Sequence, residues 1–287
     1  MKLNKKTKLV FILVAFFLIG LAVPSYSWTR KNVKEIETFY NSKLSPIIMI
    51  PGSSATENRF DGLVRKLNQD RRGTKHSLLK VKVWNNGRIT FEGKIKEKDN
   101  EPVIVIGFEN NKDGYNNIKK QTKMMNQAFE ALQNKYNFNN FKGLGHSNGG
   151  LIYTAFIENY LSDYDVKINS LMTIGTPYNF TETNIKNKSV MLADFIAAKE
   201  NIPSTLHVYS VAGTITYDSD ELVPDASVSA GKYIYQNQAK SYTEITVTGE
   251  DAQHSDLPTN DEVVELIKQH IEGQGVRKKQ KTNLEPQ

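Results

Sequence analysis

The sequence predicts an α/β fold in which helices cover both faces of a mostly parallel central sheet. Short apolar runs of strand length alternate with longer segments whose apolar residues recur every three or four positions. This alternation is typical of strands joined by right-handed helical crossovers. The runs at 46–50 and 102–108 are almost continuously apolar, as expected of parallel strands that are buried on both faces. At 287 residues, the chain is long enough to bury one sizeable core.

The first predicted strand, at 46–50, ends at the turn Pro51-Gly52-Ser53-Ser54, and a helix is predicted from 57 to 68. A hairpin is predicted next, because Asn86-Gly87 separates two alternating segments. The remaining predicted elements are a strand at 102–108, a long helix at 118–136, a strand at 141–145, a helix at 151–161, strands at 168–175, 206–211 and 245–249, and a helix at 263–271.

A small insertion is predicted at 178–203, before the strand at 206–211. Four apolar residues in it have the spacing of one helix face: Val190, Met191, Phe195 and Ile196. This face has two interpretations. It lines an acyl pocket as part of a small cap, or it packs on the sheet.

Residues 1–28 have the pattern of an export segment. Lysines precede an apolar run from Leu9 to Val23, which is shorter than the roughly 20 residues of a membrane span. Ser25 and Ser27 then provide small residues at the spacing of a signal peptidase site. We therefore expect a cleaved signal peptide or a retained N-terminal anchor. Either one predicts an exported protein, secreted or tethered to the outer face of the cytoplasmic membrane.

The other predicted parts are a leading helix or tether at 29–45, a catalytic domain at 46–272 and a basic, disordered tail at 273–287. The net charge of +6 arises at the two ends of the chain, which excludes a basic nucleic-acid surface on the domain. The absence of cysteine excludes disulfides and thiolate metal sites.

Ser147 is the candidate nucleophile. It stands at the centre of Gly145-His146-Ser147-Asn148-Gly149, between a predicted strand and a predicted helix. A serine hydroxyl is a weak nucleophile at neutral pH, and a sharp strand-to-helix turn raises it to meet a base and oxyanion donors. The flanking glycines give that turn room.

A histidine must serve as the general base, and five are available: His76, His146, His207, His254 and His270. We expect the side chain of His146 to point away from the adjacent Ser147. His207 lies in a predicted strand, and His270 lies in the last helix. His254 follows the last predicted strand and precedes that helix, so it is the candidate base.

The order Ser, acid, His requires a carboxylate between Ser147 and His254. The loop after the strand at 206–211 offers four: Asp218, Asp220, Glu221 and Asp225. For the oxyanion, a nucleophile of this kind uses its following amide and one from an earlier strand-to-helix turn. These are the amides of Asn148 and Ser53.

Several motifs carry a family resemblance over residues 46–272. They are Ile48-Met49-Ile50-Pro51-Gly52, the hairpin at Asn86-Gly87, Gly143 to Gly150, Ile174-Gly175-Thr176-Pro177, Ser219 to Pro224, and His254 with Leu257. With these motifs the sequence resembles the α/β-hydrolase superfamily, within it a lipase-like group of exported cell-surface hydrolases of Gram-positive bacteria. The resemblance implies that Asp220 is the triad acid. Pro51 stands where that group usually has histidine, Asn148 where methionine is common, and Glu221 where glycine is usual.

The resemblance implies a serine hydrolase that cleaves carboxylic esters, with a small-molecule or lipid ester as substrate and no cofactor. An amidase or peptidase of the same fold, or a non-catalytic surface-binding protein, is the alternative. We expect no metal site, because no His-Glu-x-x-His string occurs. Asp251, His254 and Asp256 are better explained as a polar loop.

Overall fold

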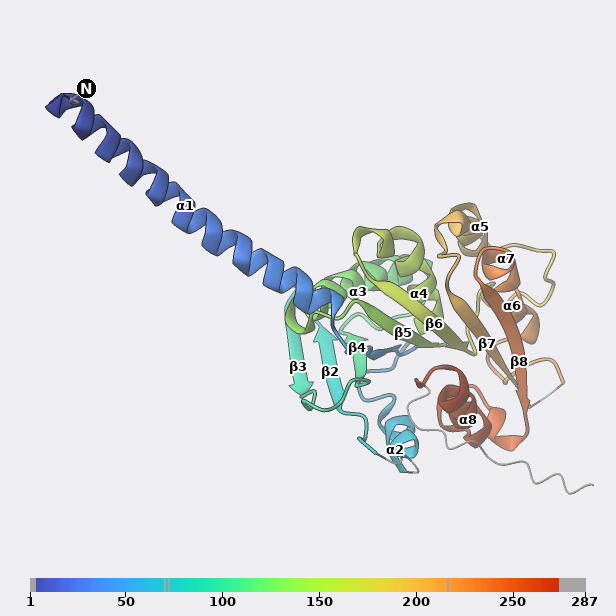
Figure 1. Cartoon of the computed structure of the whole chain (residues 1–287). Helices are drawn as coiled ribbons and strands as arrows, with labels where there is room; N and C mark the ends of the chain where they lie inside the picture. The colour runs from blue at the N-terminus through green and yellow to red at the C-terminus, as the bar shows by residue number, and fades with distance from the viewer. Residues whose placement is uncertain (1–3, 70, 72, 216, 274–287) are drawn as a thin grey trace, which may run out of the picture. The chain divides into compact units, whose positions relative to one another are not determined.

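One eight-stranded sheet, in the order β3-β2-β4-β1-β5-β6-β7-β8, organises the chain after its N-terminal helix (Figure 1). The computed structural model describes residues 4–273 except 70, 72 and 216. The strands are β1 (Ile47–Ile50), β2 (Leu78–Val83), β3 (Ile89–Gly93), β4 (Val103–Phe108), β5 (Asn140–His146), β6 (Lys167–Ile174), β7 (His207–Thr214) and β8 (Ser241–Thr248). Neighbouring strands pair in parallel except β2 and β3, which form the predicted hairpin. The predicted α/β architecture is confirmed.

Helices cover both faces of the sheet (Figure 1). They are α2 (Asp61–Gln69), α3 (Tyr115–Tyr136), α4 (Asn148–Asn159), α5 (Val190–Ala198), α6 (Asp225–Ser229), α7 (Lys232–Tyr235) and α8 (Asp261–His270), with short 3₁₀ turns at Leu161–Asp163, Lys199–Asn201, Glu250–Ala252 and Leu257–Thr259. Alternate residues of β1 enter different cores. Ile48 and Ile50 pack with α3, α4 and α5, whereas Ile47 and Met49 pack with α2 and α8. The continuous apolar run therefore reflects a strand buried on both faces.

The helix predicted from residue 57 begins only at Asp61. Before Asp61, the side chain of Thr56 forms a hydrogen bond with the backbone that favours a turn. The hydroxyl of Thr56 accepts a hydrogen bond from the amide of Asn58 at 3.3 Å, and residues 56–61 turn through bonds of the i to i+3 type. Such local bonds favour turns over helix. Arg59 therefore lies in this turn, ahead of α2.

The insertion packs into the domain. Met191, Leu192 and Phe195 of α5 are buried in the core that α4 also lines, whereas Val190 is 73% exposed. Ser189 begins the helix by accepting a hydrogen bond from the amide of Leu192. This arrangement favours the packing interpretation of the apolar face.

The chain divides after Ser42 into two units, of which the first is a single helix, α1 (Lys5–Tyr40). Residues 29–40 continue this helix without a break, and Pro24 lies within it. Among the described residues, no helix is both long and apolar enough to cross a membrane. The tail predicted from residue 273 lies, beyond that residue, outside the described part of the chain.

Candidate active site

Ser147 is the single residue between the end of β5 and the start of α4, and its backbone has φ 55° and ψ −128°. This backbone conformation is rare for residues other than glycine, and it is found at positions held by their surroundings. Here the amide of Ser147 donates to the carbonyl of Ile174 at 2.8 Å, and the carbonyl of Ser147 accepts from the amide of Gly150 at 3.0 Å. The turn fixes the hydroxyl at the carboxyl edge of the sheet.

Two glycines of the motif have no room for a side chain. A Cβ on Gly145 would lie 2.6 Å from the amide nitrogen of Gly150, and a Cβ on Gly149 would collide with the carbonyl oxygen of Ile50. Close contact between the start of α4 and the strands beneath it therefore requires glycine at both positions. These contacts account for the glycines on either side of Ser147.

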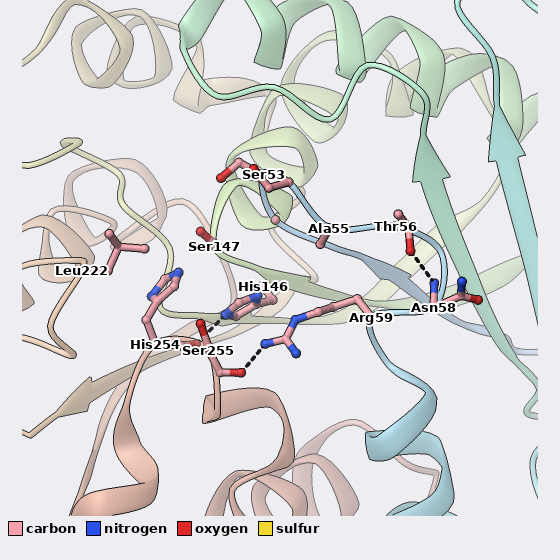
Figure 2. Close-up of a pocket in the computed structure, with 12 residues that line it drawn as sticks. Ser53, Ala55, Thr56, Asn58, Arg59, His146, Ser147, Leu222, His254 and Ser255 are labelled. Carbon is pink, nitrogen blue, oxygen red and sulfur yellow. Dashed lines mark hydrogen bonds between the residues drawn. The ribbon is translucent and has the colours of Figure 1, made fainter.

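Ser147 opens into a cavity of about 560 Å³ (Figure 2). The lining residues are Gly52, Ser53, Ser54, Ala55, Thr56, Asn58, Arg59, His146, Ser147, Leu222, His254 and Ser255. They come from the turn after β1, the end of β5, the loop after β7 and the loop after β8. Ser147 and His254, which are 107 positions apart in the sequence, share this cavity.

His254 is held by Asp220. The ring Nδ1–H donates to Oδ2 of Asp220 at 2.6 Å, and the amide of His254 donates to the carbonyl of Asp220 at 3.0 Å. Oδ1 of Asp220 accepts from the amides of Leu222 and Val223 at 3.1 and 2.7 Å. Because the carboxylate accepts a hydrogen bond from Nδ1–H and so keeps the proton on that nitrogen, a neutral ring has its lone pair on Nε2.

The other carboxylates of that loop do not contact His254 through any hydrogen bond among the described residues. Asp225 begins α6, and its amide donates to the carbonyl of Asp218 at 2.8 Å. Burial raises the pKa of the Asp225 carboxyl. Glu221 accepts a hydrogen bond from the side chain of Gln253. The structure thus distinguishes Asp220 from its three neighbours, a choice that the residue pattern alone left open.

Three of the five histidines have partners outside this cavity. His76 is bonded to Glu101 and Glu272, His207 to Ser241, and His270 stacks on Tyr209.

His146 lines the same cavity as Ser147, and its side chain, which was expected to point away from Ser147, is directed to the loop of His254. Its ring lies 4.9 Å from the ring of His254, centroid to centroid, and its Nε2–H donates to the carbonyl of His254 at 2.9 Å. Burial lowers the pKa of His146 well below its ordinary value, and electrostatic interaction with the neighbouring His254 and Arg59 lowers it further. His146 is therefore a neutral donor that supports the loop of His254 (Figure 2).

The two predicted oxyanion residues occupy different positions. Ser53 lines the cavity, in a turn where a Cβ on Gly52 would lie 2.7 Å from Cβ of Ser147. Asn148 follows Ser147 as the first residue of α4 and is buried. Its side-chain amide donates to Asp113 at 2.8 Å. Within the described part of the chain, neither the amide of Ser53 nor that of Asn148 has a protein acceptor. The described residues therefore leave the hydrogen-bonding capacity of both amides unused.

Among the described residues, no group of three or more histidine, cysteine, aspartate or glutamate side chains is arranged to hold a metal ion. His254, which the sequence placed beside Asp251 and Asp256, is instead bonded to Asp220.

A family model described as "Alpha/beta hydrolase of unknown function (DUF915)" matches residues 34–274. Among solved structures, a protein of Lactobacillus plantarum WCFS1 described as a "putative cell surface hydrolase" is 50% identical, with a TM-score of 0.73. The match covers 79% of this chain and 91% of that one. The product of the gene lin2722 of Listeria innocua is 28% identical with a TM-score of 0.74, over 82% and 96% of the two chains. No curated protein matches the chain.

Proposed function

The chain belongs to the alpha/beta hydrolase family described as DUF915, and from this premise we propose that it is a serine hydrolase that cleaves carboxylic esters through an acyl-enzyme intermediate. The observation that carries the proposal is the arrangement around one cavity. Ser147 lies there on a strained turn, and His254 faces the same space (Figure 2). The Nδ1–H of His254 donates to Asp220. The α/β-hydrolase fold uses these residue types in this chain order.

The proposed reaction begins when Nε2 of His254 takes the proton of the Ser147 hydroxyl as its Oγ attacks the ester carbonyl carbon. The carbonyl oxygen becomes an anion, which the amides of Ser53 and Asn148 stabilise by hydrogen bonds. When the intermediate collapses, the carbon–oxygen bond to the alcohol breaks, and His254 gives its proton to the leaving alkoxide. A water molecule then attacks the acyl group by the same route, which releases the acid and restores Ser147.

Asp220 has two roles in this proposal. Its carboxylate keeps the proton of neutral His254 on Nδ1, and its negative charge stabilises the imidazolium that forms during attack. Burial supports both roles, because Asp220 is 1% exposed and its Oδ1 already accepts two amide hydrogen bonds. The charge is therefore held in place before the substrate binds.

The main alternative is an amidase or peptidase, because the same groups cleave amides. An ester is favoured because an alkoxide leaves more readily than the amide anion that an unprotonated amide would release, so the same triad cleaves esters more readily than amides. The test is a comparison of 4-nitrophenyl butyrate with butyryl 4-nitroanilide, on the full chain and on Ser147→Ala. We expect hydrolysis of the ester, much slower hydrolysis of the anilide, and the loss of both in the variant. Faster cleavage of the anilide would identify an amidase. No cleavage of either, with no labelling of Ser147 by a fluorophosphonate, would indicate a non-catalytic protein.

We also propose that the protein is exported. The lysine-rich start, the apolar run from Leu9 to Val23 and the small residues after it support export. The 50% identical Lactobacillus protein is described as a cell surface hydrolase. Fractionation of cells that express the chain with a C-terminal tag tests the proposal, because recovery of the tag only in the cytosol would exclude it.

A further inference from the structure

Most of the residues that line the cavity beside Ser147 carry polar side chains. Beyond the residues of the proposed triad, hydroxyl, amide and guanidinium groups line it: Ser53, Ser54, Thr56, Asn58, Arg59 and Ser255. The apolar side chains on the wall are those of Ala55 and Leu222, and Leu222 is 64% exposed. A site for a long acyl chain buries that chain against apolar side chains. The wall of this cavity also presents polar groups that can hydrogen-bond a substrate beyond its ester group.

Arg59 is the permanently charged group of that wall. The cavity lining includes no carboxylate among the described residues, and the two histidines are its other titratable side chains. Arg59 reaches the cavity because it lies in the turn before α2, where helix was predicted. From there its Nη2 donates to the carbonyl of Ser255, in the loop of His254. The guanidinium thus lies within the wall, close to the candidate base (Figure 2).

Most N–H groups of the Arg59 guanidinium have no acceptor among the described residues. The guanidinium carries five N–H groups, and Ser255 provides its one protein acceptor within the described part of the chain. Burial lowers the pKa of Arg59, and the nearby carboxylate of Asp256 opposes that effect. An arginine guanidinium is not deprotonated in proteins, so the group stays charged. A partly desolvated cation with free donors binds a planar anion strongly, through two parallel hydrogen bonds.

We propose that the natural substrate is an ester that also carries a carboxylate, and that Arg59 binds this carboxylate while Ser147 attacks the ester carbonyl. The inference rests on the proposed function and names the substrate class of the same site. Arg59 is a specificity-determining residue in this account. The lipid ester expected from the lipase-like resemblance is replaced by a polar, anionic ester.

Two pairs of esters test the proposal, each differing by one charge. The first pair is the 4-nitrophenyl monoester of adipic acid and its methyl ester, which place the charge in the acyl part. The second is 4-acetoxybenzoate and its methyl ester, which place it in the leaving alcohol. The values of kcat/KM are compared for the full chain, for Arg59→Gln and Arg59→Lys, and for the control Arg65→Gln. Arg65 is an exposed residue of α2 outside the cavity.

In at least one pair, we expect the anionic ester to be preferred by about ten- to a hundredfold, as for a hydrogen bond between charged groups. Arg59→Gln is expected to remove the preference, Arg59→Lys to keep part of it, and Arg65→Gln to keep all of it. In the unmodified protein, the preference should also fall between 50 and 500 mM salt while kcat/KM for the neutral ester stays constant.

Equal kcat/KM values within both pairs, or a preference that survives in Arg59→Gln, would overturn the inference and leave the proposed function standing. The salt series keeps the test decisive if Arg59→Gln does not fold. If no ester of either pair is hydrolysed and Ser147 is not labelled by a fluorophosphonate, the proposed function fails and the inference fails with it.

Discussion

His254 is joined to Asp220 by two hydrogen bonds, one from its ring Nδ1 to the carboxylate at 2.6 Å and one from its amide to the carbonyl at 3.0 Å. The carboxylate therefore orients the ring, and the backbone bond fixes the loop that carries it. A single residue of the loop after β7 sets both the tautomer and the position of the candidate base.

Asp220→Asn is predicted to lower kcat by about 10⁴, because an amide does not hold the proton on Nδ1 of His254 as a carboxylate does. The matched controls are Asp218→Asn and Asp225→Asn, which remove nearby carboxylates that have no hydrogen bond to His254 among the described residues. The measurement is kcat for a 4-nitrophenyl ester. A large loss in either control, with Asp220→Asn little affected, would move the acid to another residue.

Gly52→Ala is predicted to impair hydrolysis more than stability. The new Cβ would lie 2.7 Å from Cβ and 3.2 Å from Oγ of Ser147, so the serine or the turn must shift. A displacement of about 1 Å at a reacting atom lowers kcat by up to about a hundredfold. Thermal unfolding and kcat are measured together. A normal kcat would show that the turn after β1 moves freely away from Ser147.

His146→Phe is predicted to lower kcat because the carbonyl of His254 loses its donor. An unsatisfied buried carbonyl also destabilises the fold by about 1–3 kcal/mol. His146→Gln supplies an amide donor and is expected to recover part of kcat. If Phe and Gln gave the same kcat, the ring of His146 would fill space without positioning the loop.

Glu158, on α4, is predicted to make the protein less stable as pH rises. It is 4% exposed, and burial raises its pKa from its ordinary value of 4.5 to about 9. The folded state thus keeps a proton that the unfolded state releases, and stability is lost between about pH 4.5 and pH 9.

The slope from Glu158 is at most about 1.4 kcal/mol per pH unit. Urea unfolding of the full chain and of Glu158→Gln between pH 5 and pH 8 measures it. Glu158→Gln should be less sensitive to pH, whereas equal slopes in the two proteins would exclude Glu158 as the source.

Local patterns in the sequence predict most of the strands and helices of the fold. The apolar run before Pro51 and the glycines around Ser147 predict a buried strand and a sharp turn, because each depends on neighbours within a few positions. The start of α2 was predicted too early, since Thr56 forms a side-chain bond that hydrophobic spacing does not reveal.

These local patterns do not predict the contacts of the site between residues that are far apart in the sequence. His146 contacts a carbonyl 108 positions away, a bond that its sequence position beside Ser147 does not predict. The residue pattern left four acids open, and the family resemblance favoured Asp220. Phe195 was a candidate for the acyl pocket, but it packs in the core and lines a different cavity with Tyr115.

The central claim, that Ser147 is the nucleophile, is tested most directly by mass spectrometry after treatment with a fluorophosphonate. We predict one covalent adduct on the intact chain, located at Ser147 by peptide mapping, absent in Ser147→Ala and formed far more slowly in His254→Ala. An unmodified chain, or an adduct at another residue that persists in Ser147→Ala, would contradict the account.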